Sequence, residues 1–202
     1  MRLHLASGNA HKAAEFATLA ASAGLPLELV AAQGAGGMPA VAEDAGTFAG
    51  NARKKARALL ARLPAGSWVL ADDSGLCVAA LGGGPGVESA YYAGPEGDSA
   101  ANLRKLVETM EGVPANQRQA YFICVLVLID GAGVEHVFEG RCEGALRDVP
   151  VGGGGFGYDP LFVPAGRTRT FAELPEPEKN ALSHRGRAWM RLAAWLRSRE
   201  GM

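Results

Sequence analysis

The sequence predicts an α/β protein with a mixed β-sheet, and three observations support this prediction. A strand, a glycine turn and a helix open the chain in succession. An apolar strand at 68–71 follows a second helical segment. The β-forming stretch at 120–129 then turns back on itself through Gly131 and Gly133, as a long antiparallel hairpin does. Strands that alternate with helices, together with a hairpin, are typical of a mixed sheet covered by helices.

The first third of the chain supplies strands and helices in alternation. Arg2–Ala6 is expected to form a short buried strand, and Asn9 is placed to cap a helix that Gly24 and Pro26 end near Ala23. The next predicted elements are a strand over Leu27–Ala32, a Gly- and Pro-rich loop over Gln33–Gly46, a helix over about Thr47–Leu63, and a strand over Trp68–Ala71 that ends at Asp72-Asp73-Ser74-Gly75.

The remaining elements continue this alternation. Asp98 is placed to cap a helix to about Glu111, in which apolar residues recur at helical spacing. The elements after it are the hairpin strands Ala120–Ile129 and Val134–Arg147, a glycine loop over Gly152–Asp159, and a last helix over about Ser183–Arg199.

Composition limits the function classes. The 202 residues, 48% of them hydrophobic and 20% charged, predict one globular domain over 1–202. A net charge of -1 argues against a nucleic-acid partner, which would require a strongly basic surface. Three cysteines without a CxxC pair argue against a disulfide framework. The chain has no apolar run of membrane-spanning length and no signal-peptide pattern, so a cytoplasmic enzyme without a membrane partner is expected.

The segment Ser7-Gly8-Asn9-Ala10-His11-Lys12 suits a phosphate group. Here a strand gives way through glycine to a helix, and the first turn of that helix carries Lys12. Backbone N–H groups at a helix N-terminus and the positive end of the helix dipole attract an anion, and a lysine adds a point charge. An ordinary capped helix with a solvated lysine is the alternative interpretation of this segment.

The pair Asp72-Asp73 indicates a metal site. Acids at the carboxyl end of a strand face the crevice where open α/β sheets bind ligands. Successive strand residues point to opposite sides, so one aspartate can face that crevice while the other holds its surroundings. Carboxylate oxygens favour Mg²⁺, which is commonly shared with substrate phosphates. A turn in which Asp72 and Ser74 bond only to the backbone is the alternative.

Two further segments carry groups suited to a nucleotide base. The loop at 152–160 contains a formal GxGxxG, but Tyr158-Asp159-Pro160 prevents the helix that a dinucleotide fingerprint needs. Its bare backbone permits close approach of a ligand, with Phe156 available to stack on a base and Asp159 to accept hydrogen bonds. Before the last helix, donors gather at Lys179, Ser183, His184 and Arg185, although surface decoration is a competing explanation for that cluster.

Taken together, these segments resemble the inosine triphosphate pyrophosphatase family, also called the Ham1 or non-canonical purine NTP pyrophosphatase family. The resemblance covers almost the whole chain. The motifs that carry it are Ser7-Gly8-Asn9 with Lys12, Thr47-Phe48 with Asn51-Ala52, Ala71-Asp72-Asp73-Ser74-Gly75, Gly153 to Pro160, and Ser183-His184-Arg185-Gly186.

The resemblance implies an elongated two-lobed α/β fold with a central mixed β-sheet flanked by helices, a substrate cleft between the lobes, and a homodimer. It also implies Mg²⁺-dependent hydrolysis of ITP, dITP and XTP to the monophosphate and pyrophosphate, which cleanses the nucleotide pool. Asp73 matches the general base and a metal ligand, and Glu43 most nearly matches a second ligand, with Asp44 as the alternative. Substrate-binding positions of the family are matched by Ser7, Gly8, Asn9, Ala10, His11, Lys12, Ser74, Phe156, Gly157, Tyr158, Asp159, Lys179, His184 and Arg185.

Two positions depart from the family's pattern. Gly50 stands where a glutamate usually precedes Asn51-Ala52, and Tyr91 stands where an arginine is usual. These changes could alter metal affinity and phosphate contacts. Two other functions stay open. One is a pyrophosphatase for altered pyrimidine triphosphates, because a related fold family uses similar phosphate chemistry. The other is a nucleotide sensor that binds without turnover, in which Gly50 and Tyr91 mark lost chemistry.

Overall fold

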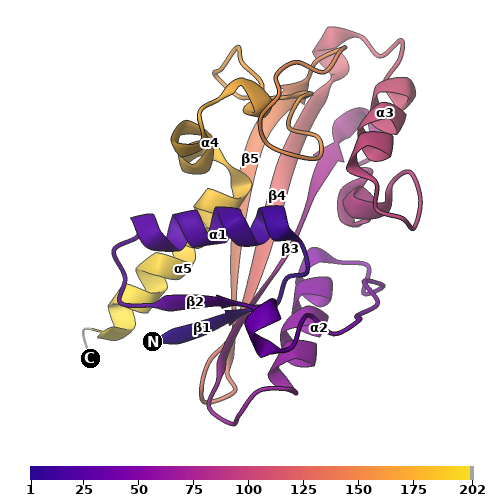
Figure 1. The fold of residues 1–202 in the computed structure, drawn as a ribbon. Helices are drawn as coiled ribbons and strands as arrows, with labels where there is room; N and C mark the ends of the chain where they lie inside the picture. The colour runs from indigo at the N-terminus through magenta and orange to yellow at the C-terminus, as the bar shows by residue number, and fades with distance from the viewer. Residues whose placement is uncertain (201–202) are drawn as a thin grey trace. The chain divides into compact units, whose positions relative to one another are not determined.

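The computed structural model describes residues 1–200 and shows an α/β fold with a six-stranded mixed sheet (Figure 1). The strand order is β2-β1-β3-β4-β5-β6; β1 pairs in parallel with β2 and β3, whereas β5 and β6 are antiparallel. The strands are β1 (Arg2–Leu5), β2 (Glu28–Ala31), β3 (Trp68–Val78), β4 (Gln119–Ile129), β5 (Glu135–Leu146) and β6 (Phe162–Pro164). The predicted fold class is confirmed.

Helices α1, α2 and α3 begin where the sequence places capping residues. Asn9 caps α1 and Thr47 caps α2 through single side-chain hydrogen bonds, and Asp98 accepts two backbone N–H groups at the start of α3. The helices are α1 (Ala10–Ser22), α2 (Phe48–Leu60), α3 (Ser99–Thr109), α4 (Glu176–Leu182) and α5 (His184–Glu200). Within residues 1–200, no helix combines the length and apolar character that a membrane span requires.

Short 3₁₀ turns interrupt the connections between these elements. They are Ala32–Ala35, Ala79–Leu81, Gly86–Tyr91, Ala115–Gln117 and Phe171–Glu173. The first of them corrects the prediction of an unbroken loop over Gln33–Gly46, because the chain makes one tight turn before the loop begins.

The chain divides into two compact units. The first unit comprises Met1–Asp73, Cys124–Gly140 and the chain from Arg185 onward, and the second comprises Ser74–Ile123 and Arg141–His184. The long strands β3, β4 and β5 contribute residues to both units.

In the first unit, helices cover both faces of the sheet. Helices α1 and α5 cover one face, where Phe16 and Trp189 pack with Leu70 of β3. Helix α2 covers the other face, where Ala56 packs with Val69. Neighbouring residues of β3 therefore enter different core clusters, as the alternation of side chains along a strand requires.

The second unit has an aromatic core. Phe122, Phe162 and Phe171 meet with ring centroids 4.8 to 5.9 Å apart, and Leu106 of α3 packs in the same cluster. The sequence patterns predict neither the three-residue strand β6 nor the seven-residue helix α4, because both are too short to show a period.

The structure corrects the predicted end of the third strand. The expectation was that Trp68–Ala71 would stop at Asp72, whereas β3 continues through both aspartates to Val78. Buried Leu76 and Val78 enter the core of the second unit, so the strand gains packing beyond the acids. Asp72 and Asp73 consequently lie in mid-strand, and their carboxylates are satisfied by side chains rather than by a turn.

Candidate active site

Asp72 and Asp73 lie side by side in β3 and bind different lysines. Asp72 pairs with Lys12 of α1, at 2.8 Å, and Asp73 pairs with Lys55 of α2, at 2.9 Å. Because α1 and α2 pack on opposite faces of the sheet in the first unit, the two carboxylates point to opposite sides. The expectation that adjacent acids face different ways is confirmed.

On the α1 side, Asp72 forms ion pairs with two cations, Lys12 and Arg185. Its Oδ2 atom lies 2.8 Å from Lys12 Nζ and 3.9 Å from Arg185 Nη2. Arg185 also forms an ion pair with Glu15 of α1, and its guanidinium is almost fully buried. Burial alone would raise the pKa of Asp72, but Lys12, Arg185 and Lys55 together hold that pKa well below its ordinary value. Asp72 is therefore a fixed anion that orients two cations.

The predicted phosphate-binding segment forms the start of α1. Ser7 is buried and accepts the N–H of Asn9, whose own Oδ1 accepts the N–H of Lys12 at 3.1 Å. The segment from Gly8 to His11 is exposed, so the helix N-terminus is open to an anion. The Lys12 ammonium group is at the same time held by Asp72, which fixes where that positive charge lies.

On the α2 side, Lys55 joins two carboxylates. Its Nζ lies 2.9 Å from Asp73 Oδ1 and 3.0 Å from Glu43 Oε2, and the lysine is buried. Fully buried Asn51 donates from Nδ2 to Asp73 Oδ2 at 3.2 Å. Asp44 instead pairs with Lys54 and stays exposed. The geometry thus favours Glu43 over Asp44 as the acid that accompanies Asp73.

The protonation of Asp73 differs from that of its neighbour. Burial raises the pKa of Asp73 to about 6, with Lys55 and Lys12 acting in the opposite direction and Glu43 adding to the rise. A carboxyl group with a pKa near neutrality can accept a proton at physiological pH, which suits a general base. Asp72, whose pKa is lowered, has no such capacity.

The donor set around Asp73 fits a small hard cation. Two carboxylates, from Glu43 and Asp73, converge on the single Nζ atom of Lys55. Among residues 1–200 no group of three or more His, Cys, Asp or Glu side chains is arranged to hold a metal by itself. Mg²⁺ is commonly bound by one or two carboxylates together with water and phosphate oxygens, so the residues present fit that ion.

The base-binding residues predicted in the second unit form a compact group. Asp159 is buried, and its Oδ2 accepts the N–H of Phe156 at 2.9 Å and the ammonium of Lys179 at 2.8 Å. Lys179 Nζ lies 5.3 Å from the centre of the Phe156 ring. A Cβ on Gly155 would lie 2.2 Å from Asp159 Oδ2, so the loop approaches this carboxylate too closely for any other residue. Asp159 therefore orients Lys179 and the Phe156 loop.

The other predicted positions in the second unit have different surroundings. The ring of His184 stacks on Phe122, with centroids 4.7 Å apart and an angle of 11° between the planes. Tyr158 is buried, and its hydroxyl donates to the carbonyl of Ser89 at 2.8 Å. Gly157, which precedes Tyr158, has a φ of 62°. Ser74 is half-buried in β3. Tyr158 thus holds the loop to the rest of its unit.

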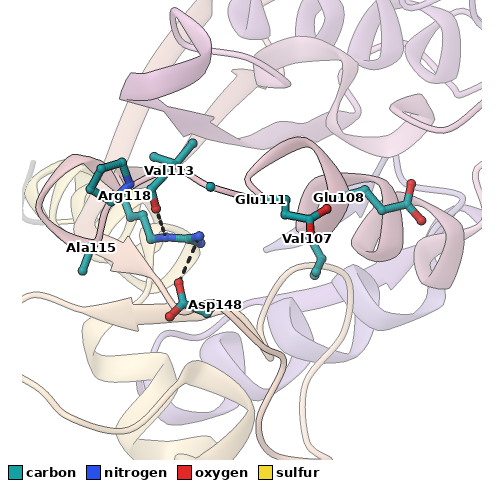
Figure 2. A pocket seen from close by; sticks show the side chains of 9 residues that line it. Val107, Glu108, Glu111, Val113, Ala115, Arg118 and Asp148 are labelled. Atoms are coloured by element: carbon teal, nitrogen blue, oxygen red, sulfur yellow. Dashed lines mark hydrogen bonds and ion pairs between the residues drawn. The ribbon is translucent and has the colours of Figure 1, made fainter.

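A separate cavity of about 610 Å³ lies in the second unit beside the C-terminal end of α3 (Figure 2). Arg118 donates there to the carbonyl of Val113 and pairs with Asp148 at 3.0 Å. It also donates to the carbonyls of Met110 and Arg147, so its guanidinium is used in joining backbone segments. None of the predicted site residues lines this cavity, and its chemistry is structural.

Sequence reasoning missed Lys55, and it gave Asn51 and Glu15 no role. A signal for the first two exists in α2, whose buried face reads Asn51, Ala52, Lys55, Ala56 and Leu59. An amide and a lysine four residues apart on an otherwise apolar helical face are rarely left unpaired, so this pattern indicates a buried acidic partner. Glu15 carries no comparable signal, because its partner Arg185 lies 170 residues away in the chain.

The chain is similar to known proteins over almost its whole length. The model of the Ham1 family matches residues 3–195. The dITP/XTP pyrophosphatase of Opitutus terrae is 62% identical over 201 residues, covering 98% of this chain and 99% of that protein; that of Streptomyces coelicolor is 48% identical, covering 97% of each.

Solved structures agree with the sequence comparison. The Ham1 protein of Staphylococcus aureus superimposes with a TM-score of 0.85 at 33% identity, covering 98% of this chain and 100% of that chain. A HAM1 protein from Coxiella burnetii gives a TM-score of 0.86 at 37% identity, covering 98% and 99%. The chain therefore belongs to the Ham1 family.

Proposed function

We propose that this protein is a nucleoside triphosphate pyrophosphatase that hydrolyses ITP, dITP and XTP to the monophosphate and pyrophosphate, and so cleanses the nucleotide pool. The observation that carries the proposal is the pair of adjacent buried aspartates in β3, one held by half-buried Lys12 and the other by buried Lys55. Membership of the Ham1 family and relatives named dITP/XTP pyrophosphatase support it.

The residues of the first unit would perform the reaction. Lys12 and the N-terminus of α1 bind phosphate oxygens. Asp73 orients a water molecule and accepts its proton while the water oxygen bonds to the α-phosphorus. The bond from the α-phosphorus to the bridging oxygen breaks, and pyrophosphate leaves with that oxygen. Asp72 keeps Lys12 in place throughout, because it remains ionised.

Magnesium is part of the proposal as a cofactor held by Asp73 and Glu43 together with substrate phosphates. When bound, the ion neutralises negative charge on the phosphates and strengthens the polarisation of the phosphorus. Lys55 then serves to keep the two carboxylates near each other before the ion and the substrate arrive. Removal of divalent ions with EDTA should abolish pyrophosphate release, and added Mg²⁺ should restore it.

Base selection is assigned to two donors of the second unit, Lys179 and His184, and to Arg185 of the first unit. The 6-oxo group of hypoxanthine and xanthine is an acceptor, and Lys179, His184 and Arg185 are donors. Adenine carries an amino group at that position, which cannot accept from these donors, so each hydrogen bond to the 6-oxo group is lost at a cost of about 1 to 3 kcal/mol. Phe156 would contribute stacking on the planar base.

The decisive experiment measures pyrophosphate released from ITP, XTP, dITP, GTP, ATP and UTP with and without Mg²⁺. Preference for the first three supports the proposal. Faster release from UTP would mean a pyrimidine triphosphate pyrophosphatase. Saturable binding of ITP without turnover would mean a sensor. A chain that neither binds nor cleaves any of the six would exclude all three functions.

A homodimer and a cytoplasmic location complete the proposal. The three cysteines are free and buried, which fits a reducing compartment. Light scattering coupled to size exclusion tests the dimer directly, because a monomer of 20.9 kDa is readily separated from twice that mass.

A further inference from the structure

The loop that carries Glu43 rests on the first turn of α2 at two adjacent positions. Asn51 Oδ1 accepts the N–H of Ala45 at 3.0 Å, while the Nδ2 of the same amide donates to Asp73 at 3.2 Å. One fully buried side chain therefore connects the backbone of the loop to the carboxylate assigned as the base.

Gly50 provides the space for this contact. A Cβ at Gly50 would lie 2.6 Å from Ala45 Cβ and 2.8 Å from Thr47 Oγ1, both closer than atoms can approach. The Thr47 hydroxyl could rotate away, but Ala45 Cβ can move only with its backbone. In this chain, a side chain at position 50 would consequently require the backbone at Ala45, which follows Glu43 and Asp44, to shift.

We propose that Gly50 and Asn51 are positioning residues that dock the 43–47 loop on α2, so that Glu43 and Asp73 meet at Lys55. The inference rests on the proposed function for its catalytic consequence. It accounts for a glycine in the first turn of a helix, a place where glycine lowers helix stability. Glycine at this position lowers the stability of the helix but leaves the space that the loop occupies.

The test compares Gly50→Ala, Ala45→Gly and the double variant. Alanine favours the helix, which offsets part of the cost of displacing the loop, so Gly50→Ala should stay folded with a Tm close to that of wild type. We expect kcat for ITP to fall at least tenfold, with KM changed less than threefold, because Lys12 and the start of α1 are untouched. The double variant, which removes the Ala45 methyl group, should recover kcat to within threefold of wild type.

A second measurement, hydrogen exchange, detects docking of the 43–47 loop on α2 and does not depend on catalytic turnover. In wild type, hydrogen exchange at the Ala45 amide should be protected, because Asn51 accepts its hydrogen. Exchange should accelerate at least tenfold in Gly50→Ala and in Asn51→Ala. Asn102→Ala is the matched control: Asn102 is also a buried helical amide that holds a loop, accepting from Ala93 and donating to Ala90, but it touches no acid. It should leave Ala45 exchange unchanged.

The outcomes separate this inference from the proposed function. Wild-type kcat in Gly50→Ala, or a loss that Ala45→Gly fails to recover, would overturn the positioning role while leaving the pyrophosphatase proposal intact. Unprotected Ala45 in wild type would overturn the docking itself. If wild type releases no pyrophosphate from any triphosphate, the proposed function and the catalytic consequence fail together, and exchange at Ala45 still decides whether the loop docks.

Discussion

The two units of the molecule use charge in different ways. In the first unit, two lysines and a buried arginine bind several carboxylates: Lys12 and Arg185 meet at Asp72, and Lys55 joins Asp73 to Glu43. In the second, Lys179 is paired with Asp159 next to an aromatic core. The aspartates Asp72, Asp73 and Asp159 are all buried, but those of the first unit lie among further charged side chains, whereas Asp159 lies next to an aromatic core.

This difference indicates that the two units have different roles in the proposed function. A network with several cations and acids can hold phosphate charge and transfer a proton, and it cannot distinguish one base from another. An oriented lysine beside aromatic rings can read the edge of a planar base while contributing little to phosphate chemistry. The reaction is therefore assigned to the first unit, and base selectivity to Lys179 and Phe156 of the second unit with Arg185 as a donor from the first. The kinetic predictions below test that assignment.

The largest effect is expected from Asp73→Asn. The variant removes a base and an anionic ligand with little change in volume, so kcat should fall by at least ~10²-fold. Asp44→Asn is the matched control, since Asp44 lies in the same acidic loop but is exposed and paired with Lys54. Near-wild-type kcat in folded Asp73→Asn, or an equal loss in Asp44→Asn, would contradict the assignment.

Lys12→Ala and Lys179→Ala should lower kcat/KM in different ways, and this difference distinguishes the roles of the two units. A point charge on phosphate is blind to the base, so Lys12→Ala should lower kcat/KM for ITP and ATP by the same factor, roughly ten- to a hundredfold for a lost charge-assisted contact. Lys179→Ala should lower kcat/KM for ITP more than for ATP. Steady-state kinetics with both substrates measures the two ratios. A changed ratio in the first variant and an unchanged one in the second would reverse the assignment.

The element order could be predicted well from the sequence, whereas the path of β3 could not. Caps at Asn9, Thr47 and Asp98 are local signals, because each is a side chain bonding to backbone within three residues. Asp72-Asp73-Ser74-Gly75 has the composition of a turn, and only tertiary partners keep it extended. Those partners, Lys12 and Lys55, are distant in sequence.

The site was predicted in its residue types more than in its connections. Resemblance to a family indicated the residues, and the alternation of a strand indicated that the two aspartates diverge. Which acid accompanies Asp73 depended on how a loop folds, and neither Glu43 nor Asp44 carries a local signal that decides it. The pairing of Arg185 with Glu15 likewise depends on the docking of the last helix against the first.

Adjacent aspartates should affect stability in opposite directions as pH changes. The pKa of Asp73 is raised from 3.8 to about 6, so its contribution to stability is present below pH 3.8 and is lost as pH rises to about 6. The pKa of Asp72 is lowered, so its contribution is present above pH 3.8 and is lost as pH falls. Urea unfolding in EDTA between pH 3 and 8 measures both, each as wild type relative to the Asp→Asn variant. Differences of the same sign would contradict the opposed environments.

The smallest effect is expected from Tyr158→Phe, which tests whether the second unit also relies on neutral hydrogen bonds. The variant removes the bond from the Tyr158 hydroxyl to the Ser89 carbonyl without altering the packed ring. The free energy of unfolding should fall by about 1 kcal/mol, since a buried acceptor loses its donor. Tyr92→Phe is the control, because the Tyr92 hydroxyl makes an exposed contact with Thr109, and the change there should stay within about 0.5 kcal/mol.

KM for ITP should be nearly unchanged in Tyr158→Phe, because the Tyr158 hydroxyl is already bound to the backbone of its own unit. A large rise in KM with unaltered stability would instead make the hydroxyl a substrate contact, and the loop at 156–159 would then read the substrate directly through Tyr158.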